Sequence, residues 1–418
     1  MALARRVLRL VEAERPVVAA PRRDPDDQAP GRDARGRGDG GALARARRLV
    51  GRGGRDGDEC EGDGGEGGGR STHGANLLRR CPRVDRRTAE GPLAGLPESP
   101  VMSELPDVMR AIVAAEPGGP EVLELREVPR PSPGPGEVLI RVAAAGVNPV
   151  DAKTRSGAGA TRFLGDDGFP WIPGWDLAGT VVEAGFGVAR FGVGDRVFGT
   201  VGFPYAAGAY AEYATAHVSQ LSRSPRSLDD VHAAALAMGG LTAWQALVDA
   251  GGLETNQRVL VTAAAGGVGH LAVQIAADLG AVVVAVASPD NVDFVRTLGA
   301  SEIVDRTQPD WAAGIEPVDL ALDAFGGPAR EPAASTVKPG GTIVTLPTAN
   351  RPPAPDGVHD PLVFVAPDGL ELQLLTGSVE RGALKPHVSE TLPLADAARA
   401  HELIAAGGTR GKIVLTID

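Results

Sequence analysis

The chain has 418 residues, enough for two domains of ordinary size that each bury a hydrophobic core. It carries 42 basic and 53 acidic side chains, of which 20 and 18, respectively, fall in the first 108 residues. Residues 109–418 therefore have an excess of 13 acidic groups, which argues against a nucleic-acid or anionic-membrane surface. No stretch approaches the roughly 18 consecutive apolar residues of a membrane span.

Residues 1–108 are rich in Arg, Gly and acidic side chains and contain few apolar residues. Such a composition cannot offset the entropy lost on ordering, so we expect this extension to be disordered. It is either a flexible tail that binds RNA through Arg and Gly, or non-native sequence upstream of a true start at Met102 or Met109. We favour the second interpretation because regular patterning begins abruptly at Met109. It predicts that a chain beginning there loses nothing.

Both cysteines, Cys60 and Cys81, lie in this extension. The remaining residues thus have no thiol for a disulfide, a nucleophile or a zinc site. The first 20 residues are Arg-rich but lack the apolar core and the cleavage pattern of a secretory signal. We therefore expect a cytoplasmic protein.

Turn-forming residues divide residues 109–228 into short apolar or alternating runs. EPGGP and RPSPGPG separate the runs RAIVAA, LELREVP and EVLIRVAAAGV, and LAGTVVEAG, DRVFGTV and AYAEYATAH follow. These runs predict β-strands of a compact, antiparallel, barrel-like domain.

The pattern changes near residue 229. SLDDVHAAALAMGGLTAWQALVDAGGL has helical spacing and an Asp-rich entry, and from RVLVTAA to GTIVTLP strand-length apolar runs alternate with helix-length segments. This alternation predicts a parallel sheet of βαβ units. The chain ends in a helix, a glycine stop and the strand GKIVLTI. We expect this strand to return to the first domain, since its alternation suits an antiparallel partner.

A glycine cluster, AAAGGVGH, lies between a predicted strand and a predicted helix. In the G-x-G-x-x-G frame of dinucleotide sites, its positions are Ala264, Gly266 and Gly269. Gly266 permits close approach to a pyrophosphate and Gly269 permits tight packing of helix on strand. Ala264 replaces the first glycine of the motif, which is tolerable if the backbone there does not need a positive φ. The alternative interpretation of the whole cluster is a tight structural turn that binds no ligand. The helix N-terminus offers free N–H groups to phosphate.

The residue that follows the second strand of this unit indicates which dinucleotide binds. NAD sites usually present a carboxylate to the ribose 2′-hydroxyl there, whereas this chain has Ser288. The missing carboxylate favours NADPH, with NADH possible. Ser288, Asn291 and Arg306 are candidates to hold the 2′-phosphate, although Asp290 is unfavourable and Arg306 is equally explained as a solvated loop residue.

Several motifs resemble the medium-chain dehydrogenase/reductase superfamily, and within it the zinc-independent quinone oxidoreductase branch. They are AAGVNPVDAKTRSG, PGWDLAGTVVEAG, GVGDRVFG, MGGLTAWQAL, AAAGGVGHLAVQIAADLGA and GGTRGKIVL, in the expected order over residues 109–418.

The resemblance implies an α/β plus β fold, in which both chain ends build a GroES-like β-barrel-type substrate domain. A Rossmann doubly wound parallel-sheet domain is inserted, with the active cleft at the junction. The corresponding domains are 1–108 (extension), 109–235 (GroES-like, first part), 236–370 (Rossmann) and 371–418 (return to the GroES-like domain). The resemblance also implies a homodimer.

No metal is expected. Zinc alcohol dehydrogenases of this superfamily place a Cys where this chain has Asn148, and Gly-His-Glu where it has Gly174-Trp175-Asp176. The chain has no Cys there and only scattered His, so it lacks a set of zinc ligands. Simple alcohol oxidation, which depends on a metal to acidify the hydroxyl, is therefore disfavoured.

The reaction must then depend on positioning and proton supply. Asn148 is a candidate to orient the nicotinamide ribose or the acceptor carbonyl, or else caps the turn before Pro149. Thr242 matches a family position near the nicotinamide, or bonds only locally at a helix N-terminus. Asp151 and Lys153 could supply a proton or charge, or form a surface ion pair.

Other predicted site residues are aromatic or follow strands. Tyr205 and Trp171 are candidates to stack a flat substrate, although large aromatics are more often core residues. The scattered histidines, including His270, are interpreted as structural or surface residues. Pro347 and Leu346 follow the fifth parallel strand. The predicted cofactor-binding residues are Ala265, Gly266, Gly267, Val268, Gly269, Ser288, Arg306, Phe325, Gly326 and Leu346.

The sequence thus predicts a zinc-independent NAD(P)H oxidoreductase that passes hydride to a quinone or to the C=C bond of an α,β-unsaturated carbonyl. Its partner is then a small molecule, with no nucleic acid and no membrane. One alternative is an enoyl-thioester or 2-alkenal reductase on the same scaffold. Another is a non-catalytic NADPH-binding redox sensor.

Overall fold

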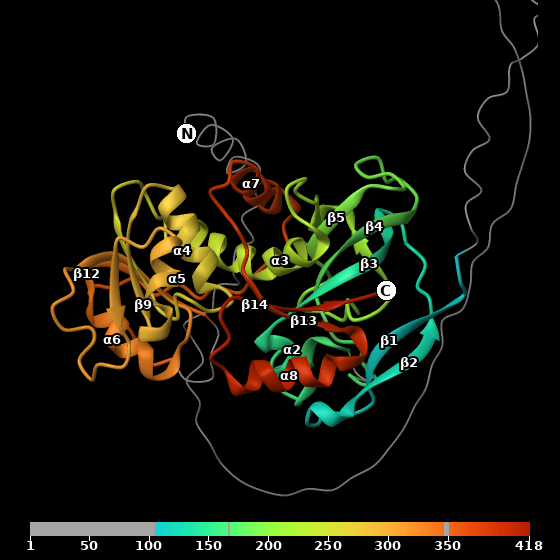
Figure 1. Ribbon diagram of the computed structural model, residues 1–418, viewed down its shortest axis with the longest axis horizontal. Helices are drawn as coiled ribbons and strands as arrows, with labels where there is room; N and C mark the ends of the chain where they lie inside the picture. Colours follow the sequence, from blue (N-terminus) through green and yellow to red (C-terminus); the bar gives the residue numbers. More distant parts are fainter. Residues whose placement is uncertain (1–104, 166–167, 347–350) are drawn as a thin grey trace, which may run out of the picture. The chain divides into compact units, whose positions relative to one another are not determined.

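Two large sheets, one parallel and one largely antiparallel, and a third sheet of only two strands lie in the part of the chain that the structure describes (Figure 1). The computed structural model describes residues 105–165, 168–346 and 351–418. The predictions made for residues 1–104, including those for both cysteines, lie outside these ranges, as does Pro347.

The seven-stranded sheet is built from the two ends of this region. Its strand order is β13-β14-β3-β4-β5-β7, with β6 paired to β3. The strands from the first end are β3 (Glu137–Val147), β4 (Asp176–Ala184), β5 (Arg196–Thr200), β6 (Tyr213–His217) and β7 (Leu221–Arg223). Helix α2 (Pro149–Arg155) follows β3. Strand β3 is buried along most of its length, with Arg141 as its exposed residue, and it pairs with three neighbours, so it forms the centre of this domain.

The chain's other end completes this sheet, as the sequence predicts. After α7 (Gly369–Glu380) come β13 (Val388–Pro393), α8 (Ala397–Ala406) and β14 (Lys412–Thr416). Strand β14 pairs antiparallel with β3, where Ile413 faces Val147, and it pairs parallel with β13. Gly407 ends α8 with a φ of 69°, a conformation that favours glycine.

The parallel sheet has five strands in the order β10-β9-β8-β11-β12. They are β8 (Arg258–Val261), β9 (Val282–Ala287), β10 (Glu302–Asp305), β11 (Val318–Asp323) and β12 (Val337–Thr345). The connecting helices are α4 (Gly269–Asp278), α5 (Val292–Thr297) and α6 (Arg330–Ser335). The strand order turns back between β8 and β11, so a crevice is expected at the carboxyl ends of these two strands. The predicted Rossmann domain is confirmed.

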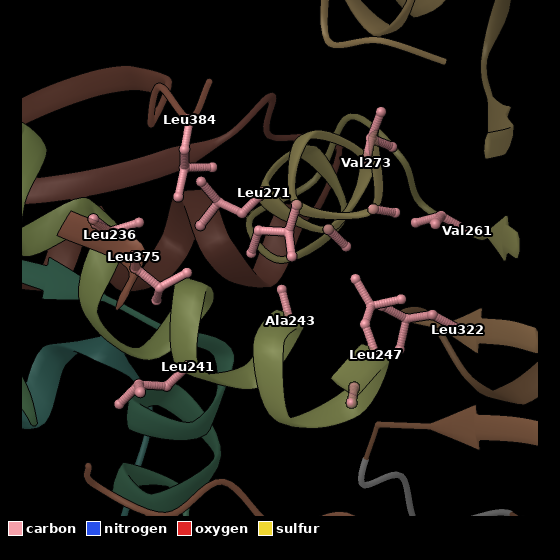
Figure 2. Close-up of a cluster of buried hydrophobic side chains, with 14 of the residues drawn as sticks. Leu236, Leu241, Ala243, Leu247, Val261, Leu271, Val273, Leu322, Leu375 and Leu384 are labelled. Atoms are coloured by element: carbon pink, nitrogen blue, oxygen red, sulfur yellow. The ribbon is translucent and has the colours of Figure 1, made fainter. Parts of the chain in front are cut away.

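Helix α3 (Asp230–Trp244) connects the two domains. The Asp229 carboxylate caps its start by accepting from the N–H of His232, and a π-helical turn (Gln245–Ala250) continues it. The helix packs against β3, β4, β5 and β14 of one sheet and against α4. Figure 2 shows Leu236 and Leu241 of this helix, and Leu247 of the π-helical turn, among side chains from α4, α7, β8 and β11. One continuous core thus fixes the two domains on a shared helix.

The same helix has a second property. Asp230–Ala250 is long and apolar enough to cross a membrane by length and composition, but most of it is buried inside the fold. Among the described residues, its apolar character is thus accounted for by packing. Helix α3 crosses the predicted domain boundary between residues 235 and 236. Helix α7 begins at Gly369, just before the predicted boundary between residues 370 and 371. Both boundaries stay predictions.

The first strand, β1 (Val108–Ala114), forms a hairpin-like pair with β2 (Leu123–Pro129). It begins before Met109, because Val108 is paired with Pro129. Arg130 also depends on the preceding residues, since its backbone N–H donates to the carbonyl of Asp107 at 2.9 Å and its Nε donates to that of Pro106 at 2.7 Å. A start at Met109 therefore removes contacts that a start at Leu105 keeps.

We accordingly expect a chain truncated to begin at Met109 to be less stable than one that begins at Leu105, by about 1–3 kcal/mol, because two hydrogen bonds and a strand pair are lost. Urea denaturation of the two truncated chains and of the full chain measures the difference. Identical midpoints for the two truncated chains would contradict this expectation and support a start at Met109.

Candidate functional site

A cleft of about 1290 Å³ runs from the carboxyl ends of β8, β9 and β11 to the start of α2 and the loop before β14. Its lining residues come from both domains. Two loops at the turning point of the parallel sheet are tied together, because the hydroxyl of Thr262 donates to Asp323 at 2.9 Å and accepts from the N–H of Ala324. The cleft thus lies where a dinucleotide would bind in a doubly wound sheet.

The glycine cluster forms the turn between β8 and α4, which we call the glycine turn (residues 262–268). Its positive φ, 47°, falls on Ala263 and not on Ala264, so the substitution at Ala264 is accommodated. A Cβ at Gly269 would lie 2.1 Å from the carbonyl oxygen of Ala263, which leaves no space for a side chain there. Gly269 is therefore required for the close packing of helix on strand that the motif predicts.

His270 holds this turn in place. The side chain is fully buried, its Nδ1 lies 2.7 Å from the carbonyl oxygen of Gly266, and its Nε2 accepts from the N–H of His387 at 3.1 Å. Burial lowers the pKa of His270 to about 4, so the ring is neutral at pH 7 and Nδ1 carries the proton that Gly266 accepts. The structural role expected for this histidine fits these contacts.

The end of β9 supplies polar groups to the far part of the cleft. The side-chain amide of Asn291 donates to the hydroxyl of Ser288 at 2.9 Å. Arg410, from the loop before β14, donates through Nε to the Asn291 carbonyl oxygen at 2.7 Å and to the backbone carbonyl of Asp290. Arg306 lines the same region and is exposed. Two guanidinium groups, of Arg306 and Arg410, and the hydroxyl-bearing Ser288 therefore line the same cleft.

The other end of the cleft holds a buried polar cluster centred on Asp176, which is fully buried at the start of β4. Its Oδ1 accepts from the hydroxyl of Thr200 at 2.8 Å and from the N–H of Met238 at 3.0 Å. Its Oδ2 accepts from the amide of Asn148 at 2.8 Å and lies 3.7 Å from Nζ of Lys412. Lys412 Nζ also donates to Oδ1 of Asn148. We call Asn148, Asp176 and Lys412 the Lys412 cluster.

Asn148 occupies the N-cap position of α2, but its side chain bonds across the fold to Asp176 and Lys412. The first turn of α2 is closed by Asp151, whose carboxylate accepts from the Asn148 N–H at 2.7 Å. Asp151 is fully buried and also accepts from the hydroxyl of Tyr210 at 3.3 Å. Burial is the largest cause that raises the pKa of Asp151, to about 7.

Lys153 occupies a different environment. It is exposed and lines the cleft, and no ion pair joins it to Asp151 among the described residues. The alternative of a surface ion pair between these two residues is wrong, because residues two positions apart lie on opposite sides of a helix, so that Asp151 is buried and Lys153 is exposed to solvent. Thr242 lies near the end of α3 and not at a helix N-terminus, and it lines the cleft.

Aromatic residues form part of the cleft wall. Phe203 and Phe364, which line it, are stacked with ring centroids 5.2 Å apart. Tyr205 is 62% exposed and contacts Phe163 edge to face, while Trp171 is buried in the core and does not line the cleft. Neither predicted stacking residue therefore forms the cleft wall.

Most predicted site residues lie along this one cleft, although their roles stay predictions. Gly326 does not line it, because its N–H turns inward to Asp323 at 2.9 Å. The residues that do are Asn148, Lys153, Thr242, Ala265, Gly266, Gly267, Val268, Gly269, Ser288, Arg306, Phe325 and Leu346.

Three residues that line the cleft are not among the site residues predicted from the sequence: Lys412, Arg410 and Phe364. The motif GGTRGKIVL contains the first two and served only to support the resemblance. A lone lysine at the start of a buried strand was the available signal, because lysine is almost never buried without a partner. Nothing in the local sequence shows that Phe364 reaches the cleft.

The described residues contain no group of three or more His, Cys, Asp or Glu side chains placed to hold a metal ion. At the positions where zinc enzymes of the superfamily have ligands, Asn148 and Asp176 instead contact the ammonium group of Lys412.

Comparison with known proteins identifies the family. Residues 134–226 match a family profile described as alcohol dehydrogenase GroES-like domain, and residues 298–415 match one described as zinc-binding dehydrogenase. The chain is 32% identical over 326 residues to the mitochondrial NAD(P)H oxidoreductase RTN4IP1 of Danio rerio, covering 68% of this chain and 84% of that protein. The chain belongs to the medium-chain dehydrogenase/reductase superfamily, in its quinone oxidoreductase-like branch.

Other members of this branch show comparable similarity. The chloroplast envelope quinone oxidoreductase homolog of Arabidopsis thaliana is 33% identical and matches over 71% of this chain and 95% of its own. The NADPH-dependent alkenal/one oxidoreductase of the same plant is 32% identical, with 75% and 81% covered.

Solved structures of similar proteins also match this chain over most of its length. The quinone oxidoreductase from Coxiella burnetii superimposes with a TM-score of 0.68 at 33% identity, over 74% of this chain and all of that one. The mycobacterial protein Rv1454c complexed with NADPH gives 0.65 at 30% identity, over 74% and 99%.

One expectation is overturned by these relatives. The sequence was interpreted as that of a cytoplasmic protein, whereas relatives from fish, cattle and plants are named as mitochondrial or chloroplast proteins. Their names point to organelles and not to the cytoplasm. The expectation rested on the lack of a secretory signal, which says nothing about other targeting routes.

The buried carboxyl of Asp151 makes stability depend on pH. Its pKa is about 7 in the folded chain against 3.8 ordinarily, so the folded state holds a proton that the unfolded state releases. The stability that this group contributes is fully present below about pH 4 and is lost as the pH rises to about 7.

We therefore expect the free energy of unfolding of Asp151→Asn, taken relative to that of the wild type, to increase by about 2–3 kcal/mol when the pH is raised from 5 to 8. Urea unfolding at both pH values measures this change. Asp310→Asn on the surface serves as the control and should shift stability by less than about 0.5 kcal/mol. A difference between Asp151→Asn and wild type that is the same at both pH values would contradict the raised pKa.

Proposed function

We propose that this protein is an NADPH-dependent reductase that adds hydride to a quinone or to the C=C bond of an α,β-unsaturated carbonyl. The observation that carries the proposal is the continuity of the cleft. It joins the glycine turn, at the turning point of the parallel sheet, to the buried Lys412 cluster of the other domain. Hydride and proton chemistry can thus meet in one enclosed place.

The residues present fit NADPH. Gly266 and Gly267 line the cleft and carry no side chain, so a pyrophosphate could approach the backbone of the glycine turn closely. The partial positive charge at the N-terminus of α4 favours a bound phosphate. When bound, the cofactor supplies hydride from its dihydronicotinamide ring. Ser288, Arg306 and Arg410 would hold the 2′-phosphate that distinguishes it from NADH.

The cleft wall suits a flat, apolar acceptor. Phe203 and Phe364 form a stacked aromatic surface in the cleft that Asn148 also lines. The loop that carries Phe364 is held by Gln245, whose amide donates to the carbonyl of Ala366 at 2.8 Å and accepts from its N–H at 2.9 Å. A quinone or enone ring would bury its faces on this surface and direct its oxygen to the polar cluster.

The reaction is proposed to need no zinc. This rests on the side chains present, because Asn148 and Asp176 offer their oxygens to the ammonium group of Lys412. A divalent ion would have to displace that cation and would find no thiolate or imidazole beside it among the described residues. The partner is a small molecule, and the acidic excess argues against nucleic acid. We also propose a homodimer, which light scattering on the full chain would test.

Turnover is the first test. With the full chain, a chelator and a panel of quinones and enones, we expect NADPH oxidation that survives chelation and is faster than NADH oxidation. Absorbance at the dihydronicotinamide band follows the reaction. Tight NADPH binding without turnover of any acceptor would overturn the reductase and favour a redox sensor, and loss of activity on chelation would overturn the metal-free reaction.

Cofactor preference depends on Arg410 in this proposal. We expect Arg410→Ala to raise the KM for NADPH about tenfold or more, because a charge-assisted contact to phosphate is lost, and to leave the KM for NADH nearly unchanged. Steady-state kinetics with each cofactor measures both. Exposed Arg399, which forms an ion pair with Glu402 on the same helix, provides the control variant Arg399→Ala. An equal rise for both cofactors would show that Arg410 supports the loop and does not read the phosphate.

A further inference from the structure

Lys412 is a buried cation at the boundary between the two domains. Only 4% of it is exposed, yet it lines the cleft. Burying an ammonium group costs free energy unless it is paired, and the strand it begins, β14, is already held by its pairing with β3 and β13. An apolar residue at this position would therefore be sufficient for the pairing of β14. The pairing does not explain why a charged residue is buried here.

The stem of Lys412 is fixed on two sides. Its Cδ lies next to Gly267, where an added Cβ would come within 3.3 Å, and the N–H of Gly411 donates to the carbonyl of Ala265 at 2.8 Å. Its own N–H donates to the carbonyl of His387 at 2.9 Å. The side chain thus runs along the glycine turn and delivers Nζ to Asn148. It reaches from the predicted cofactor site into the acceptor end of the cleft.

Hydrogen-bonding capacity remains at Nζ. An ammonium group has three N–H donors, and among the described residues Asn148 accepts one while Asp176 lies 3.7 Å away. At least one donor is therefore available to an oxygen atom in the cleft. Asn148, held by its own bond to Asp176, fixes the direction of this donor.

Burial lowers the pKa of the Lys412 ammonium group more than the surrounding carboxyl groups raise it. The groups that face Nζ are the buried carboxyls of Asp176 and Asp151 and, more distantly, His270. Burial lowers the pKa of Lys412, and Asp176 and Asp151 only partly oppose this change. Burial likewise raises the pKa of Asp176. A lysine in this environment gives up a proton more readily than one on the surface.

We propose that Lys412 is the proton donor of the reaction: its Nζ, positioned by Asn148 and Asp176, binds the carbonyl oxygen of the acceptor and protonates it as hydride arrives. This inference rests on the proposed function and names the group that completes it.

The step balances for an enone. As the β-carbon gains hydride with its electron pair, the C=C electrons move towards the carbonyl and the charge develops on its oxygen. An O–H bond forms there while an N–H bond of Lys412 breaks. The resulting enol rearranges to the saturated carbonyl, and the neutral amine regains a proton from water entering the cleft. The acceptor has then gained one hydride and one proton.

Two variants separate chemistry from packing. Lys412→Met removes the donor but leaves Asp176 buried without its counterion, which destabilises the fold. The double variant Lys412→Met/Asp176→Asn removes both charges and keeps amide partners for Asn148, so stability should recover. Lys385→Met, on an exposed lysine, is the matched control. The affinity for NADPH, measured by fluorescence, should stay within about threefold of the wild-type value in the single Lys412 variant, the double variant and the control variant.

For a proton donor, we expect kcat/KM to fall about 10²–10⁴-fold in both Lys412 variants, including the double variant of recovered stability. Wild-type kcat/KM should decrease as the pH rises through the pKa of Lys412, since the protonated form is required, and this decrease should vanish in the double variant. A double variant that retains activity within a few-fold of wild type would overturn the proposal and assign Lys412 a structural role.

A measurement without turnover completes the test. The chain has four lysines, Lys153, Lys338, Lys385 and Lys412, so lysine-selective isotopic labelling gives few side-chain NMR signals, and Lys412→Met assigns one of them. That signal should titrate below the ordinary lysine range. An ordinary titration midpoint would overturn the proton donor. A low midpoint in a wild-type chain that reduces no acceptor would instead overturn the proposed function itself, so the two failures are distinguishable.

Discussion

The buried carboxylate of Asp176 is the constraint on which the site depends. Four segments meet at its two oxygens, through the hydroxyl of Thr200 on β5, the N–H of Met238 on α3, the amide of Asn148 before α2, and the ammonium of Lys412 on β14. A carboxylate with this little water is tolerable only because each oxygen has partners and a cation lies nearby. The same contacts fix β14 against the first domain and hold Asn148 at the cleft. Stability and the geometry of the acceptor end are therefore not separable here.

Helix α3 plays the corresponding part for the whole fold. One face packs on the antiparallel sheet and another on α4 of the parallel sheet, so the two domains share a continuous core (Figure 2). Its glycines matter for this reason: a Cβ at Gly239 would lie 3.1 Å from the carbonyl of Gly267, so the helix can lie directly against the glycine turn. A shared helix of this kind sets the distance between the nucleotide end and the acceptor end of the cleft by packing, which is stiffer than a linker.

The cluster also supports the proposal that the reaction needs no zinc. Zinc alcohol dehydrogenases of the superfamily have a metal ligand at the position of Asn148. Here this corner of the first domain presents an ammonium group to the cleft, with a carboxylate behind it. The proposed acceptor, a quinone or enone, is already electrophilic, so it would need a hydrogen bond and a proton at its oxygen more than a Lewis acid. In the proposed reaction, the ammonium group of Lys412 would supply both.

The sequence by itself determined the elements and their class. Alternating runs before residue 229 gave antiparallel strands, and the strand–glycine–helix unit that includes Gly266 and Gly269 gave the parallel sheet and its crevice, because these patterns are local and periodic. Motif order along residues 109–418 supplied the family. Only the tertiary structure decided which side chains share the site. Lys412 and Asn148 are 264 residues apart and meet through the pairing of β14 with β3. Asp151 and Lys153 are two residues apart and separate, one inward and one to solvent. Contacts of that kind depend on burial and register across the fold, which no local pattern encodes.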